Sequence, residues 1–275
     1  MTQSRDLADV VDLERYPIVD LRTAAAERLV RQSQADVDES GLCLLPGFLR
    51  PEAVETMVSE AESSRASAFF KDYLFPVYYD REAAESTDLP AGHPRRHRSP
   101  NTCGAIGYDM FPLDSPIRQL YESPSLTSFL SAVLRRDVYP CADPLIGLVL
   151  SVTGDGQELG WHFDGNDFVV SLMLRPSGQG GEFEYAPHIR SPEDENYDAV
   201  SRVLGGSRDD VISVALQPGT LALFRGQRSL HRVAPVAGPR ERLIALFSYD
   251  SQPDMVYSDE VHLRVVGRTV ALPVA

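Results

Sequence analysis

Hydrophobic and polar positions follow a helical periodicity in the first part of the chain. Over residues 21–40, apolar positions recur among charged ones at the spacing of one helix face, and Gly41 ends the pattern. Residues 52–70 form a second amphipathic segment behind Pro51, which a first helical turn tolerates. Between the two segments, the short apolar run 42–49 is bounded by turn residues and predicts a strand.

The rhythm changes after Pro144. Short apolar runs now alternate with turns rich in Gly, Pro and Asp, and a helical stretch over residues 194–204 interrupts them. Many short strands at close spacing indicate a β-sandwich or a jelly roll. The predicted strands cover residues 145–152, 168–174, 181–185, 211–216, 220–224 and 243–249.

The segment between residues 71 and 112 shows neither the helical periodicity nor the succession of short apolar runs. It is rich in proline and carries a basic cluster over residues 93–98, so we expect a long loop, which in a compact domain is functional or disordered. The cluster has two interpretations, a solvated turn and a lid over a site. In a lid, Arg96 or Arg98 would meet a substrate carboxylate, because the planar guanidinium suits that group.

Two short helices are expected before the strands, over residues 115–121 and 123–135, because each opens with a Ser-Pro pair. Repeats, low-complexity tracts and linkers are not visible. We therefore expect one domain over residues 1–275, divided into a helical layer with lid (1–143), a jelly-roll core (144–250) and a C-terminal extension (251–275).

Composition and charge narrow the range of partners. The formal net charge of −14 argues against nucleic acid or an anionic membrane surface as the main partner. The three cysteines are unevenly spaced and indicate neither a disulfide framework nor a zinc finger. No leader pattern opens the chain, and no run approaches the roughly 18 apolar residues that a membrane-spanning helix needs. These features favour a cytoplasmic protein with a small-molecule partner, and they leave the oligomeric state open.

The candidate chemistry lies in Trp161-His162-Phe163-Asp164. His162 and Asp164 are two residues apart, so on an extended strand both side chains point to one face. A distant His231 would complete a set of two histidines and one carboxylate, which leaves coordination positions open and suits non-haem Fe(II). A His-x-Asp pair is common by chance. The flanks of His231 and the basic residues that follow it make the ordered set more specific.

Four sequence blocks together resemble the Fe(II)- and 2-oxoglutarate-dependent oxygenases, in that family's order: 161–164, 180–185, 216–224 and 231–238. The resemblance implies a mainly β fold with flanking helices, built on a double-stranded β-helix (a jelly roll, cupin-like) with the metal inside one open end. The longer run from His93 to Tyr185 resembles the bacterial branch related to BesD, which contains halogenases and hydroxylases of free amino acids.

Carried over by this resemblance, His162, Asp164 and His231 would ligate Fe(II), with 2-oxoglutarate and dioxygen as co-substrates. Halogenases of this branch lack the carboxylate, because a halide occupies its coordination position. Since Asp164 is present, we predict oxygen chemistry on a C–H bond. The outcome would be hydroxylation, with desaturation or ring closure as alternatives.

The family also needs a basic residue to pair with the far carboxylate of 2-oxoglutarate, and Arg240 and Arg242 compete for this role. Arg242 directly precedes the apolar strand 243–247, whereas Arg240 follows Gly238-Pro239 and belongs to a turn. We therefore prefer Arg242, whose planar fork can bind a carboxylate through two parallel hydrogen bonds.

Asn166 and Asp167 follow the ligand pair, and one of them would face the cavity by strand alternation. Asp167 would suit an amine, and Arg96 or Arg98 a carboxylate, so the four residues together suit a small amino acid or derivative in a biosynthetic pathway. Turn and surface roles are the alternative for each. Two further classes compete: a cupin-type dioxygenase or isomerase that does not use 2-oxoglutarate, and a binding module without activity. An arginine at the 2-oxoglutarate position speaks against both.

Overall fold

Two antiparallel sheets form the core of the computed structural model, which describes residues 7–79 and 81–272. The first has the order β1 (Leu42–Leu45), β13 (Leu221–Phe224), β9 (Val169–Arg175), β16 (Arg242–Phe247), β7 (Leu148–Thr153), β5 (Gly104–Gly107), β2 (Phe69–Phe70). The second has the order β12 (Ile212–Val214), β11 (Phe183–Ala186), β14 (Leu230–Val233), β8 (Leu159–His162), β4 (Arg98–Asn101), β3 (Tyr73–Pro76). Two short pairs complete the strands: β10 (Gln179–Gly180) with β15 (Val236–Ala237), and β17 (Tyr249–Asp250) with β6 (Tyr139–Pro140).

Strand alternation separates the two faces of the seven-stranded sheet. On β7, Leu148, Leu150 and Val152 are fully buried in the large core under the helices. The intervening Val149 and Ser151 line a partly enclosed cavity on the opposite face. The sequence of this strand therefore builds the hydrophobic core with one set of side chains and the wall of a cavity with the other.

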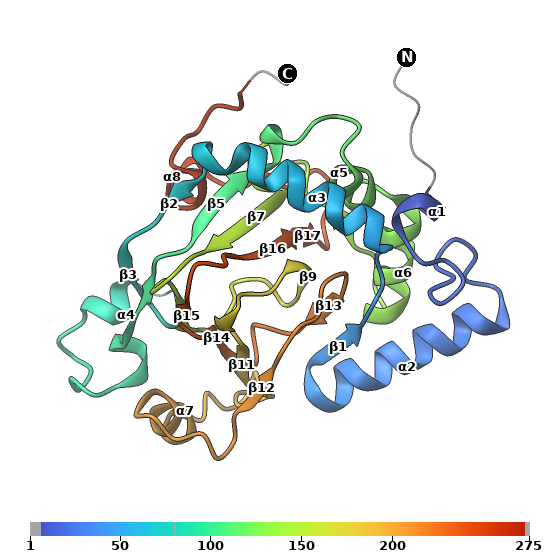
Figure 1. Cartoon of the computed structure of the whole chain (residues 1–275). Helices are drawn as coiled ribbons and strands as arrows, with labels where there is room; N and C mark the ends of the chain where they lie inside the picture. The colour runs from blue at the N-terminus through green and yellow to red at the C-terminus, as the bar shows by residue number, and fades with distance from the viewer. Residues whose placement is uncertain (1–6, 80, 273–275) are drawn as a thin grey trace.

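Helices cover the outer face of the seven-stranded sheet, and α3 runs across it in Figure 1. This layer comprises α1 (Leu7–Val10), α2 (Ala24–Ser40), α3 (Pro51–Ser64), α5 (Pro116–Tyr121) and α6 (Pro124–Leu134). The expected end of the helix over residues 21–40 is confirmed in α2, since Gly41 adopts a left-handed conformation with φ 74° and its N–H donates to the carbonyl of Val37. The helix expected over 52–70 ends earlier: after Ser64 come a short turn, η1 (Arg65–Ser67), and β2.

The segment 71–112 is not the long loop that its prolines predict. It supplies β3, β4 and β5, which extend both sheets, together with α4 (Arg81–Glu85), η2 (Pro94–Arg96) and η3 (Tyr108–Met110). Pro76 is tolerated because β3 is an edge strand of its sheet. The prediction failed because these strands are short and pair with segments distant in sequence.

The C-terminal extension forms α8 (Asp259–Val266), and the excursion between strands forms α7 (Tyr197–Leu204). Helix α8 packs Val266 against Ala105 and Val149 of the neighbouring sheet. A buried pair anchors it, with His262 Nε2 lying 2.6 Å from a carboxylate oxygen of Asp143. The extension is therefore part of the core.

We expect His262→Ala to lower the free energy of unfolding by about 3 kcal/mol, because it leaves the buried Asp143 carboxylate without its hydrogen-bond partner His262. Chemical denaturation measures the free energy of unfolding of this variant and of a control, His97→Ala, which removes an exposed histidine. Equal denaturation midpoints for the two variants would show that the pair does not hold α8.

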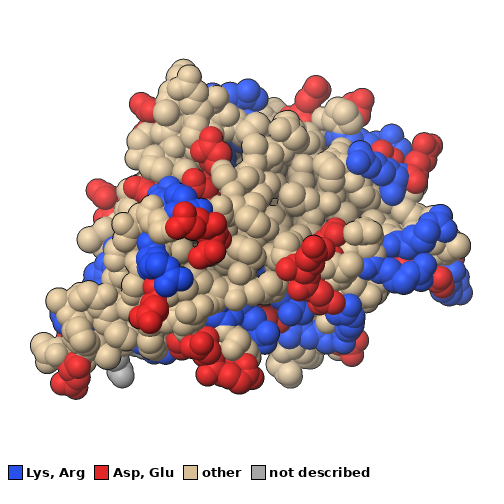
Figure 2. Space-filling view, turned by 90° about the horizontal axis from the view of Figure 1, so that it is seen from below, with Lys and Arg blue, Asp and Glu red and all other residues tan. Residues whose placement is uncertain are grey.

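The outer surface is mixed in charge. On the face shown in Figure 2, basic and acidic side chains alternate around a largely uncharged centre. That face offers no extended field of one sign of the kind that attracts nucleic acid. Within the described part of the chain, the helices are too short or too polar to cross a bilayer.

Candidate metal centre

Three side chains converge where β8 ends. His162 is the last residue of β8 and lies directly opposite His231 of β14 in the antiparallel ladder. Asp164 follows beyond the strand, with one carboxylate oxygen 3.5 Å from His162 Nε2 and 3.4 Å from His231 Nε2. One ligand atom from each residue lies within 4.8 Å of the other two. This arrangement can hold one metal ion on two imidazoles and one carboxylate.

Backbone carbonyls orient both imidazoles. His162 Nδ1 lies 2.9 Å from the carbonyl oxygen of Gly160, and His231 Nδ1 lies 2.9 Å from that of Ser229. The hydrogen bonds assign the proton to Nδ1, so each Nε2 presents its lone pair to the site. These partners are backbone atoms, and the sequence carries no signal for them.

The electrostatics of the site suit a divalent cation. Burial lowers the pKa of His162, and the neighbouring His231 lowers it further, so the neutral imidazole is favoured. Burial by itself would raise the pKa of Asp164, but His231 and His162 hold it well below its usual range. At neutral pH the site therefore presents a carboxylate beside neutral imidazole, as metal ligation requires.

Gly226 gives the Asp164 carboxylate its space. A Cβ built at Gly226 would lie 1.7 Å from Asp164 Oδ2, and the N–H of Asp164 donates to the Gly226 carbonyl at 3.1 Å. Only a residue without a side chain fits this approach. In the sequence, Gly226 has no feature that separates it from an ordinary turn glycine.

We expect Gly226→Ala to weaken metal binding at least about tenfold, since outer contacts that orient ligands typically carry this much affinity. Titration with Co(II) measures the effect. The matched control is Gly165→Ala, where an added Cβ meets nothing within 4 Å. Similar affinities in both variants would mean that Asp164 adjusts freely and that Gly226 does not position it.

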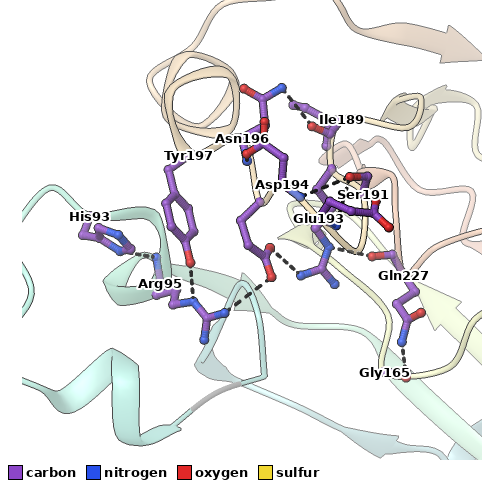
Figure 3. A network of polar contacts seen from close by, with 12 residues as sticks. His93, Arg95, Gly165, Ile189, Ser191, Glu193, Asp194, Asn196, Tyr197 and Gln227 are labelled. Carbon is purple, nitrogen blue, oxygen red and sulfur yellow. Dashed lines mark hydrogen bonds and ion pairs between the residues drawn. The ribbon is translucent and has the colours of Figure 1, made fainter.

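A polar network joins the two segments that carry the ligands (Figure 3). Arg190 donates to the carbonyl of Gln227 at 2.7 Å, and its guanidinium carbon lies 4.0 Å from the ring centroid of Phe163. Gln227 in turn reaches the carbonyl of Gly165 at 3.5 Å. Glu195 bridges Arg190 and Arg95, which fastens the basic cluster to the same network.

Asp164 also faces a cavity of about 430 Å³ between the sheets and α8. Among the predicted residues, Asn166 lines this cavity and donates to the hydroxyl of Tyr257 at 3.1 Å. Three further lining residues with charged or amide side chains were missed by sequence reasoning: Lys71, Asn101 and Arg264. They lie in segments that the sequence presents as a loop and an extension.

The other predicted substrate residues have different partners. Asp167 pairs with Arg136 at 2.7 Å and does not line the cavity. Arg96 donates to the carbonyl of Leu89 at 2.7 Å, and the exposed Arg98 lies 3.4 Å from Glu85. Arg98 lines a neighbouring hollow that shares part of the metal cavity's wall. The structure therefore brings Asn166 to the metal cavity and places the other three outside its wall.

The structure distinguishes the two competing arginines. Arg242 is 2% exposed and lines a second cavity with Phe183, whose ring centroid lies 5.8 Å from that of His231. Burial lowers the pKa of Arg242 to about 10, and among the described residues neither its Nε has a hydrogen-bond partner nor its guanidinium an acidic side chain. Arg240 is exposed and lines a different hollow, beside α3. The unpaired guanidinium of Arg242 is suited to a ligand carboxylate.

Comparisons with known proteins agree with this architecture. The model of a family described as HalD, Halogenase D, matches residues 95–263, which is more than half of the chain. No curated protein matches.

Three solved structures are similar at low sequence identity. The epimerase SnoN in complex with Fe3+, alpha ketoglutarate and nogalamycin RO has a TM-score of 0.55 at 13% identity, covering 81% of this chain and 84% of that one. AviO1 from Streptomyces viridochromogenes Tue57 has 0.54 at 17%, covering 82% and 96%. A Trichoplax adhaerens prolyl hydroxylase with a hypoxia inducible factor peptide fragment has 0.52 at 14%, covering 80% and 89%. The predicted fold is confirmed.

Proposed function

The chain belongs to the halogenase D family, and from that premise we propose that it is an Fe(II)- and 2-oxoglutarate-dependent oxygenase that hydroxylates a C–H bond of a small amino acid or amino-acid derivative. The observation that carries the proposal is the convergence of His162, Asp164 and His231, and it is supported by Arg242, which lines a second cavity and is buried with no acidic partner among the described residues. The SnoN complex, which has the same fold, contains both iron and alpha ketoglutarate and supports the same pair here.

Each part of the cofactor set has matching residues. The two Nε2 atoms and the Asp164 carboxylate would hold Fe(II), and Arg242 would hold the far carboxylate of 2-oxoglutarate. When bound, iron with 2-oxoglutarate and dioxygen supplies the oxidising power to break a C–H bond, with succinate and carbon dioxide released. The aromatic rings of Phe183 and Phe224, packed against His231, exclude water from this side of the site.

Asp164 favours oxygenation over halogenation, even though the family is named for halogenases. Its carboxylate lies against both imidazoles, at the position that a halide would need. We expect turnover in chloride or bromide to add an oxygen atom to the substrate without incorporating halogen, as mass spectrometry of the product would show. A product mass lowered by two hydrogens would instead indicate desaturation or ring closure. Halogenated product from the unaltered protein would contradict the proposal.

We further propose that residues 1–275 act as one domain in the cytoplasm. Helix α8 of the C-terminal extension forms part of the cavity wall, so the extension belongs to the site. Cys43, Cys103 and Cys141 are all buried free thiols, as is usual in a reducing compartment.

The deciding experiment is succinate formation by protein reconstituted anaerobically with Fe(II) and then supplied with 2-oxoglutarate, oxygen and a panel of free amino acids. Succinate should rise with one class of compound and disappear in Asp164→Ala. Absence of both succinate and a 2-oxoglutarate-dependent absorption band would overturn the proposal. A band without turnover would retain the enzyme class and reject the amino acids tested.

A further inference from the structure

The metal cavity has an unbalanced set of charges. Among the described residues, the charged ones that line it are Lys71, Arg264 and Asp164. The Asp164 carboxylate would ligate the metal ion and would balance part of the positive charge of that ion. Two cationic side chains therefore remain in the wall of a partly enclosed space, where an uncompensated charge is costly.

Lys71 enters the cavity from the connection between β2 and β3. Its ammonium lies 3.5 Å from the carbonyl oxygen of Cys103, and no described acidic side chain pairs with it. Burial lowers the pKa of Lys71 to about 8, so near neutral pH most molecules still carry the charge. A bound anion would compensate the cost of holding this charge in the cavity.

Arg264 enters the same cavity from α8, which the Asp143–His262 pair anchors. Its guanidinium carbon lies 5.5 Å from the ring centroid of Tyr79, another lining residue. As with Lys71, no carboxylate among the described residues forms an ion pair with Arg264. Arg264 is therefore a fixed cation on a helix, free to bind an anionic ligand.

Asn101 adds an unused acceptor between these elements. The residue is 8% exposed, lines the cavity and lies opposite Leu159 in the sheet. Its side-chain oxygen has no hydrogen-bond partner in the part of the chain that the structure describes. Buried polar atoms are normally satisfied, so an unpaired one in a cavity wall indicates a ligand donor.

We infer that the substrate carries two carboxylates, one bound by Lys71 and the other by Arg264, with Asn101 accepting a hydrogen bond from an amino or hydroxyl group of the same molecule. The inference rests on the proposed function, because it assigns the 2-oxoglutarate carboxylate to Arg242 and leaves Lys71 and Arg264 for the substrate. It replaces the expectation of a cationic amine bound by Asp167, which pairs with Arg136 outside the cavity. A basic amino acid would add a third positive charge to this wall.

The test compares isosteric ligands under anaerobic conditions, using the Fe(II)–2-oxoglutarate absorption band as the readout in place of turnover. Glutamate and 2-aminoadipate are titrated against glutamine and lysine, and glutarate distinguishes a plain dicarboxylate from an acidic amino acid. We expect the dicarboxylates to perturb the band with dissociation constants at least about tenfold lower than glutamine, since one charge pair to a buried group carries this much affinity.

Variants test which side chains cause the preference for glutamate over glutamine. In Lys71→Met and in Arg264→Met, the ratio of glutamine to glutamate dissociation constants should fall towards one, while Arg31→Met, which alters an exposed arginine of α2, should keep it. A normal band that is perturbed equally by glutamine and glutamate, or best by lysine, would overturn the inference and leave the oxygenase assignment intact. If no band forms, calorimetric titration of the metal-free protein compares the same ligands and variants. Equal glutamate binding in all four proteins would then refute the inference separately.

Discussion

Replacing Arg242 by methionine is expected to weaken 2-oxoglutarate binding by about 30-fold or more, while making the ligand-free protein harder to unfold. The loss follows because truncating one partner of a buried, hydrogen-bonded charge pair costs about 2–5 kcal/mol. The gain follows because Arg242 is 2% exposed with no described acidic partner, so a methionine of similar length removes an uncompensated buried charge. Loss of binding and gain of stability in the same variant separate a ligand-binding arginine from a structural one.

The matched control is Arg240→Met, which removes the same charge two positions earlier on the exposed surface. Titration of the anaerobic Fe(II) protein with 2-oxoglutarate gives the affinities, and denaturation without ligand gives the stabilities. We expect Arg240→Met to match the unaltered protein in both. A larger loss of affinity in Arg240→Met than in Arg242→Met would reverse the assignment.

Replacing His231 by alanine is expected to abolish succinate formation and the stabilisation that metal gives to the fold. A ligand at 100 times its dissociation constant stabilises a protein by about 2.7 kcal/mol, so the metal-dependent rise in the unfolding temperature is a direct measure of the site. His231 Nε2 points at the Asp164 carboxylate from 3.4 Å, and no other described histidine is placed to replace it at the site.

His97→Ala is the control, because this histidine is exposed and outside the cavity. Thermal unfolding with and without Co(II) should show the metal-dependent shift in the control and none in His231→Ala. A shift that persists in His231→Ala would place the metal elsewhere.

The structure brings His162, Asp164 and His231 together, as the sequence pattern suggested. Strand alternation explains only part of this, because His162 ends β8 and Asp164 lies beyond it. The expectation that Asp167 faces the cavity was wrong, because residues 163–168 form a turn without strand alternation and Asp167 pairs with Arg136.

Lys71, Asn101 and Arg264 could not be predicted, because their roles depend on tertiary pairing. Short proline-rich segments give weak strand signals, and only their register with β5 and β8 brings Lys71 and Asn101 to the cavity. Arg264 lies in helix α8, and the sequence alone does not show which part of the fold this helix packs against.

The direct pairing of His162 with His231 across β8 and β14 divides the metal site into unequal parts. Both imidazoles belong to one hydrogen-bonded ladder, so changing their separation requires breaking a sheet. The carboxylate comes from a loop beyond that ladder, held by its contact with a glycine. Selection can therefore exchange the third ligand by altering a single loop position while the platform of two histidines persists. A scaffold divided in this way can evolve between oxygen and halide chemistry without refolding.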